Sequence, residues 1–108
     1  MEYKLKATKD ELYSKGFHYN KLMSDMDSYF YSLRFPVLKY KKTPTLECEL
    51  SVELQTGDVI INVFNYGTCD IYPPFYNNEY GKFETLDVIH SAIKTQLKRI
   101  GVKEVKNA

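Results

Sequence analysis

The chain has 108 residues, of which 44% are hydrophobic and 27% charged, and its net charge is +1. These values exclude a disordered chain, and the length predicts one compact domain spanning residues 1–108. No run approaches the ~20 apolar residues of a membrane-spanning helix and no secretory signal opens the chain, so we expect a cytoplasmic protein that does not bind membranes.

Two helices are predicted in the first third of the chain. Thr8 and Glu11 have the spacing of a capping box, which starts a short helix at about 9–15, and Gly16 ends it. Asn20 can cap a second helix, which would end at Arg34-Phe35-Pro36. Its predicted apolar stripe, with spacings of three and four, is Leu22, Met23, Met26, Phe30 and Leu33.

The clearest element is an antiparallel hairpin of strands 46–55 and 58–66. From Leu46 to Gln55, five apolar residues alternate with five polar ones, which predicts a strand with one buried face. A two-residue loop at Thr56-Gly57 would make the numbers of paired residues sum to 113. The second strand is apolar on both faces, so we expect it to be central in the sheet.

A third strand, at 35–42, is predicted before this hairpin. A loop at Thr43-Pro44-Thr45 makes the paired numbers sum to 88 and places Lys39 opposite Glu49 and Lys41 opposite Glu47. A two-residue loop would turn both lysines toward the core, where their desolvation is costly. This register would partly neutralise residues 46–90, which carry one basic and eight acidic residues.

The last predicted element is a helix that begins after Thr85 and ends at Gly101. Its apolar stripe is Leu86, Ile89, Ile93, Leu97 and Ile100. Residues 68–72 are a candidate for a fourth strand. The fold class is therefore α+β, a three- to four-stranded antiparallel β-meander packed by helices, in the order α-α-β-β-β-(β)-α.

The sequence has no motif that carries a recognisable chemistry. Neither His18 nor His90 has a nucleophile and a carboxylate at a known spacing, and Asp25-Met26-Asp27 does not complete a calcium loop. Cys48 and Cys69 have no metal ligands nearby, so we interpret them as free thiols. We expect no catalytic residue, no metal and no cofactor.

The aromatic-rich region 66–83 has two interpretations: a cover for the sheet edge, or a surface that binds another protein. Acidic residues there favour a partner with a basic surface, and an apolar outer face of the sheet would also suit a homodimer. The candidate protein-binding residues are Ile60, Phe64, Tyr66, Asp70, Tyr72, Phe75, Tyr76, Glu79 and Tyr80.

Nucleic-acid binding is the alternative suggested by the two basic ends of the chain. Its candidate residues are Lys94, Lys98, Arg99 and Lys103. The near-neutral charge and the presence of only two arginines weigh against it. A small-molecule binder or minor enzyme is a third alternative, which would need a concave pocket.

The small size, the bias toward Lys, Asn, Tyr and Ile, and the lack of catalytic motifs resemble accessory proteins of phages and mobile elements in AT-rich bacteria. Some of those proteins inhibit host defence nucleases. The resemblance implies a non-enzymatic inhibitor or modulator of a host protein, in the manner of an anti-CRISPR. It rests on overall composition rather than on a motif.

Overall fold

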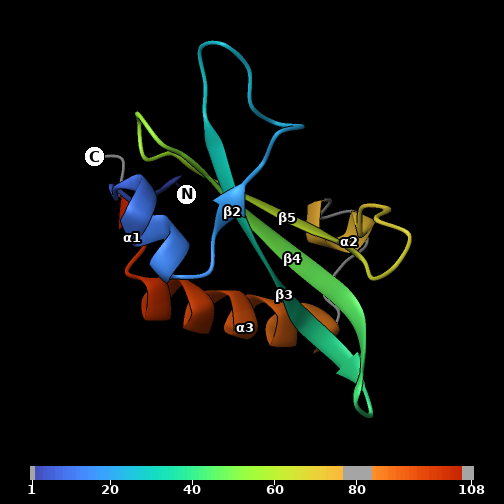
Figure 1. Ribbon diagram of the computed structural model, residues 1–108. Coiled ribbons are helices and arrows are strands. Elements are labelled where there is room, and N and C mark those ends of the chain that lie inside the picture. Colours follow the sequence, from blue (N-terminus) through green and yellow to red (C-terminus); the bar gives the residue numbers. More distant parts are fainter. Residues whose placement is uncertain (1, 77–83, 106–108) are drawn as a thin grey trace.

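The computed structural model describes residues 2–76 and 84–105. Strands β2 to β5 form an antiparallel meander in that order, and β1 pairs with β6, so the two ends of the described chain lie side by side (Figure 1). The predicted α+β class with an antiparallel meander is confirmed. The elements are β1 (Glu2–Lys4), α1 (Lys9–Ser14), β2 (His18–Tyr19), β3 (Phe30–Tyr40), β4 (Thr43–Glu53), β5 (Val59–Asn65), α2 (Pro73–Tyr76), α3 (Glu84–Ile100) and β6 (Lys103–Val105).

The hydrophobic core lies between α3 and one face of the meander (Figure 1). The predicted stripe of α3 is confirmed, because Ile89, Ile93 and Leu97 are buried in this core. They share it with the apolar side of β4, where Leu50 and Cys48 are fully buried. We call the opposite side of the sheet, which faces away from α3, the outer face.

The first predicted helix is confirmed as α1. The Glu11 N–H donates to the Thr8 hydroxyl at 3.2 Å, and the Thr8 N–H donates to the Glu11 carboxylate at 3.1 Å. Gly16 follows with φ +99°, the left-handed conformation that ends the helix. The helix places Leu12 in the core, next to Phe17 from the segment that enters β2.

The predicted second helix is wrong. Residues 20–29 form a loop and β3 begins at Phe30. Tyr31 and Leu33 alternate along β3 and lie opposite Val52 and Leu50 of β4, so they join the core face of the sheet. Leu33 fits both the helical and the strand period, and long-range pairing with β4 decides between the two.

The predicted register of the β4–β5 hairpin is wrong by two, because paired numbers sum to 111 rather than 113. A two-residue loop of the favoured type needs positive φ at both central residues. Gly57 has φ +79°, but the β-branched Thr56 does not adopt positive φ, and a four-residue loop results. A shift of two keeps every side chain on its predicted face, and Leu50 lies opposite Ile61.

The predicted register between β3 and β4 is also wrong. Paired numbers sum to 83 rather than 88 along most of the ladder, because the strands turn at Lys41-Lys42. A β-bulge at Val37 of β3 and an unpaired residue at Thr45 of β4 interrupt the pairing on either side of Leu38 and Leu46. The bulge changes which face the following residues occupy, so Val37 is buried while Lys39 is exposed despite the short turn.

The glutamates of β4 consequently have partners other than those predicted. Glu49 lies opposite Arg34 and accepts a hydrogen bond from its Nε at 2.7 Å. Glu47 lies opposite Pro36, while Lys41 is in the turn. Neutralisation of Glu49 within the sheet therefore comes from an arginine of β3.

Strand β5 lies at the edge of the four-stranded sheet and is not central as predicted. The following segment covers part of this edge: the Asn65 N–H donates to Asp70 O at 2.7 Å, and the Tyr72 N–H donates to Val63 O at 3.0 Å. Of the predicted fourth strand at 68–72, the structure retains one bridge, between Phe64 and Ile71.

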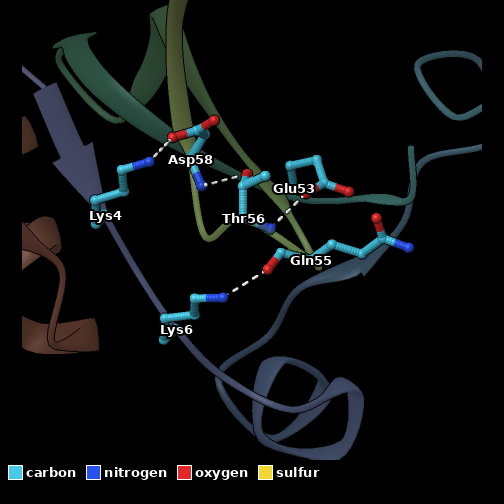
Figure 2. Close-up of polar contacts among 6 residues, drawn as sticks. All are labelled: Lys4, Lys6, Glu53, Gln55, Thr56 and Asp58. Carbon is cyan, nitrogen blue, oxygen red and sulfur yellow. Dashed lines mark hydrogen bonds and ion pairs between the residues drawn. The ribbon is translucent and has the colours of Figure 1, made fainter. Parts of the chain in front are cut away.

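An ion pair and hydrogen bonds connect the β4–β5 turn to the N-terminal segment (Figure 2). The Lys4 ammonium pairs with the Asp58 carboxylate, and the Lys6 ammonium donates to Gln55 O at 2.6 Å. The Leu5 N–H donates to Gly57 O at 2.8 Å. Residues some fifty positions apart thus hold the turn in one conformation.

Candidate functional site

The loop of residues 20–29 projects beyond the sheet between β2 and β3, and we call it the projecting loop (Figure 1). It carries two large apolar side chains that contact almost nothing: Leu22 is 99% exposed and Met26 is 93% exposed. Burying such a side chain is worth about 1.5–3 kcal/mol relative to leaving it in water. A partner that covers the loop would therefore gain free energy from burying both side chains.

Hydrogen bonds within the projecting loop hold its backbone in place. The Ser24 hydroxyl donates to Asn20 O at 2.7 Å and accepts from the Phe30 N–H at 2.9 Å. The Asp25 carboxylate accepts from the backbone N–H groups of residues 27–28, each at 2.8 Å. The loop thus presents its apolar side chains from an ordered backbone, which reduces the entropy lost on binding.

Tyrosines gather at the base of the projecting loop. Tyr13 of α1, Tyr19 of β2 and Tyr29 are each partly exposed around a hollow of about 320 Å³, with Tyr31 and Lys9 completing its lining. Tyr31 packs edge-to-face against Tyr13 and Tyr19, with ring centroids 5.7 and 5.6 Å away. Such rings offer large contact area at small entropic cost. We call this group the tyrosine cluster.

A second hollow, of about 560 Å³, lies where β2 ends beside β3. We call it the Arg34 hollow. The guanidinium of Arg34 donates to Glu49 and lies over the ring of Phe64, 4.9 Å from its centroid. The lining residues are Gly16, His18, Tyr19, Asn20, Lys21, Leu22, Ser32, Leu33, Arg34 and Glu49.

A chain of polar side chains joins the projecting loop to the sheet beneath this hollow. The Asn20 amide donates to the Ser32 hydroxyl at 2.9 Å, and the hydroxyls of Ser32 and Ser51 are 2.8 Å apart. Ser51 is fully buried, so its hydroxyl depends on Ser32 for a partner. The chain fixes the position of Asn20, from which the projecting loop starts.

The aromatic segment predicted to bind a partner is engaged with the sheet edge in its described part. The Tyr76 hydroxyl accepts a hydrogen bond from the Val63 N–H at 2.7 Å. It also donates one to the side-chain oxygen of Asn62 at 3.2 Å. Burial raises the pKa of Tyr76, so it remains protonated and able to donate at neutral pH. Tyr72 and Phe75 pack against the core.

The remaining predicted protein-binding residues are scattered. On the outer face, Ile60 is partly exposed and Phe64 is only 7% exposed, beneath Arg34. Tyr66 and Asp70 are exposed beyond the end of β5. The predicted contacts at Glu79 and Tyr80 lie outside the described residues.

The candidate nucleic-acid residues do not form one surface. Lys94 and Lys98 line a hollow of about 350 Å³ that also contains the acidic Glu104. Lys103 neighbours Glu104 along β6, so it points to the other side of the two-stranded sheet. Arg99 is one position beyond Lys98 on α3, which turns it about 100° from that lysine.

The structure brings the candidate catalytic groups to separate places. His18 lines the Arg34 hollow, whereas His90 packs against Phe75 with ring centroids 5.5 Å apart. Burial raises the pKa of Cys48 to about 12, so this thiol is not a nucleophile at neutral pH. Within residues 2–76 and 84–105, no three His, Cys, Asp or Glu side chains lie together as a metal site would need. No helix of these ranges is long and apolar enough to cross a membrane.

Sequence reasoning missed the projecting loop and the tyrosine cluster. The available signal for the loop was its content of turn-forming residues, which outweighs the helical spacing of its apolar residues. Those residues are Asn20, Ser24, Asp25, Asp27 and Ser28. The tyrosine cluster had no local signal, because it combines residues from α1, β2 and β3 with Tyr29.

The fold and these surfaces define a small α+β protein whose four-stranded meander is covered on one face by a helix. No protein-family model matches the sequence, and no curated protein matches it significantly. The fold is similar to the crystal structure of a DUF1831 family protein from Lactobacillus plantarum. The TM-score is 0.54 at 10% sequence identity, over 94% of this chain and 84% of the other, so the likeness is one of fold.

Proposed function

We propose that this protein is a non-enzymatic protein-interaction module that contacts its partner through the projecting loop. The observation that carries the proposal is the near-complete exposure of Leu22 and Met26 on a loop with an ordered, hydrogen-bonded backbone. Interfaces concentrate their energy in a few apolar or aromatic side chains that become buried on binding.

The tyrosine cluster extends this contact surface. Tyr19 precedes the projecting loop and Tyr29 is its last residue, and both are exposed at its base. Tyrosine is enriched at interfaces because its ring provides contact area while its hydroxyl remains able to hydrogen-bond. A partner that buries Leu22 and Met26 can therefore contact these rings as well. Inhibition of a host nuclease would be one consequence of such binding. Identifying the captured partner would test whether it is a nuclease.

The test is affinity capture from a lysate of the source organism with three baits: the wild type, the double variant Leu22→Ser/Met26→Ser, and a control. The control Ile71→Ser/Val88→Ser replaces two exposed apolar residues on other parts of the surface. We expect one protein to be captured by the wild type and the control and lost with the loop variant. Equal capture by all three baits would overturn the proposal.

The partner can also be a second copy of this chain. Sedimentation velocity of the wild type and the loop variant over a range of concentrations distinguishes this case. A dimer that dissociates on Leu22→Ser/Met26→Ser identifies self-association through the projecting loop. A monomer at every concentration would rule out self-association through the projecting loop.

A further inference from the structure

The Arg34 hollow adjoins the projecting loop, since Asn20, Lys21 and Leu22 belong to both. The charged residues in its lining are Lys21, Arg34 and Glu49, which leaves one surplus positive charge when His18 is neutral. The side chain of Glu49 is only 13% exposed, whereas that of Arg34 is 52% exposed. The charge that the hollow presents to solvent is therefore positive.

The guanidinium of Arg34 is held in place before any partner binds. Its Nε donates to Glu49 at 2.7 Å, and the ring of Phe64 supports it from below. A guanidinium has five N–H donors, and the hydrogen bond to Glu49 uses one. Glu49 first, and the Cys69 side chain to a smaller extent, raise the pKa of Arg34. The other N–H donors belong to a fork that matches the two oxygens of a carboxylate. Fixing the side chain in advance lowers the entropic cost of such a contact.

The backbone N–H and carbonyl of Arg34 are directed toward the edge of β3 along which β2 pairs. The Phe30 carbonyl accepts from the Asn20 N–H, so even-numbered residues of β3 before the bulge direct their backbone groups toward β2. The β2 pairing ends at His18 and Ser32. Among the described residues, no loop or turn backbone group hydrogen-bonds to the N–H or carbonyl of Arg34 on that side. The hollow is thus a gap in the sheet edge.

We infer that the Arg34 hollow receives an acidic side chain, Asp or Glu, from the protein that the projecting loop binds. The inference rests on the proposed function and adds the chemistry of the partner. A carboxylate bonds to the guanidinium of Arg34, with Lys21 contributing positive charge at the rim. The apolar residues next to that carboxylate in the partner then contact Leu22.

Random 12-residue peptides displayed on phage as N-terminal fusions provide the probe, because they have no free C-terminus and offer carboxylates only from side chains. We expect selection on the wild type to enrich peptides with Asp or Glu beside apolar residues. Selection in parallel on Arg34→Gln should lose the acidic preference. Arg99→Gln is the matched control, because it removes the same charge from α3, outside the hollow.

The selected peptide is then measured directly. Replacing its Glu or Asp with the corresponding amide should weaken binding to the wild-type protein by about 10-fold, the effect of a charge-assisted hydrogen bond. This measurement needs no protein variant, so it holds even if Arg34→Gln perturbs the fold by leaving Glu49 unpaired. Circular dichroism of the variant checks that point.

Any of three results would overturn the inference: no peptide is enriched, the enriched peptides share no acidic residue, or the acid and amide peptides bind with equal affinity. The proposed function fails by a different result, namely capture of the full-length partner that does not depend on Leu22 and Met26. If partner binding is lost with Leu22→Ser/Met26→Ser but unchanged with Arg34→Gln, the proposed function holds and the acidic contact is wrong.

Discussion

The carboxylate of Glu53, at the end of β4, accepts a hydrogen bond from the backbone N–H of Tyr29, at the end of the projecting loop, at 3.3 Å. The same carboxylate accepts from the Thr56 N–H at 2.6 Å, in the β4–β5 turn. Glu53 is only 6% exposed. One buried acid therefore connects Tyr29, at the base of the proposed contact surface, to the β4–β5 turn. Figure 2 shows its contact with Thr56.

We expect Glu53→Gln to destabilise the fold by about 1–3 kcal/mol, because a neutral amide is a weaker acceptor and brings an N–H₂ group toward N–H donors. Urea unfolding of both proteins at neutral pH measures the difference. An unchanged unfolding midpoint would show that the carboxylate contributes nothing beyond its volume.

Glu53 also predicts an acid dependence of stability. Burial acts to raise the pKa of Glu53, but hydrogen bonds from Thr56 and Tyr29 outweigh it, and the net pKa is below the ordinary 4.5. Stability from this group is complete above the ordinary pKa and is lost as pH falls through the lowered pKa. As the pH is lowered from 5 through the lowered pKa of Glu53, the free energy of unfolding should therefore fall more for the wild type than for Glu53→Gln. Parallel losses in a pH series of urea unfolding would contradict this assignment.

Gly57→Ala should destabilise the protein through two effects. The residue has φ +79°, which costs an L-residue about 1–2 kcal/mol, and a Cβ there would lie 3.0 Å from the backbone oxygen of Leu5. Gly67→Ala is the matched control, because Gly67 also has positive φ but nothing within 4 Å of its Cβ position. Thermal unfolding should show a larger loss for Gly57→Ala, and equal losses would mean that the contact with Leu5 relaxes freely.

Tyr76→Phe tests the role of the aromatic segment. Removing the hydroxyl leaves the Val63 N–H without its partner, so we expect a loss of about 1 kcal/mol in unfolding free energy, and unchanged partner capture. The sequence alone suggested that Tyr76 contacts the partner. Loss of capture by a variant that stays folded would favour that earlier hypothesis over the sheet-edge role.

Leu22→Ser/Met26→Ser should leave the unfolding free energy within about 0.5 kcal/mol of the wild type, because both side chains are almost fully exposed. Leu50→Ala, at a fully buried position of β4, should instead cost about 2–5 kcal/mol. Calorimetry or urea unfolding compares them. A strongly destabilised loop variant would mean that Leu22 or Met26 packs within this protein and is not available to a partner.

Elements whose pattern depends on near neighbours in the chain were predictable. The capping box of Thr8 and Glu11 needs only residues of one helical turn, and the stripe from Ile89 to Ile100 repeats through a whole helix. The alternation from Leu46 likewise marked β4, and its buried face was assigned correctly even though the register was wrong by two.

Elements that depend on distant partners were not predictable. The helical spacing of Leu22, Met26 and Leu33 was real, but residues 30–40 pair with β4 as strand β3, which places Leu33 opposite Leu50. The two register errors have local causes, at Thr56 and in the two-residue turn at Lys41-Lys42. Hydrophobic alternation does not distinguish registers of one parity, which explains the first error. In the second, the β-bulge at Val37 turns Lys39 away from the core, so alternation excluded the two-residue turn that the structure has.

Local spacing of apolar and capping residues was enough to predict the α+β class, the positions of α1 and α3 and the buried face of β4. The positions of three features followed from the tertiary structure alone: residues 20–29 project from the sheet, Tyr76 closes the edge of β5, and Arg34 lies over Phe64 where the pairing with β2 ends. These relationships join residues distant in the chain, and packing against the rest of the molecule selects them.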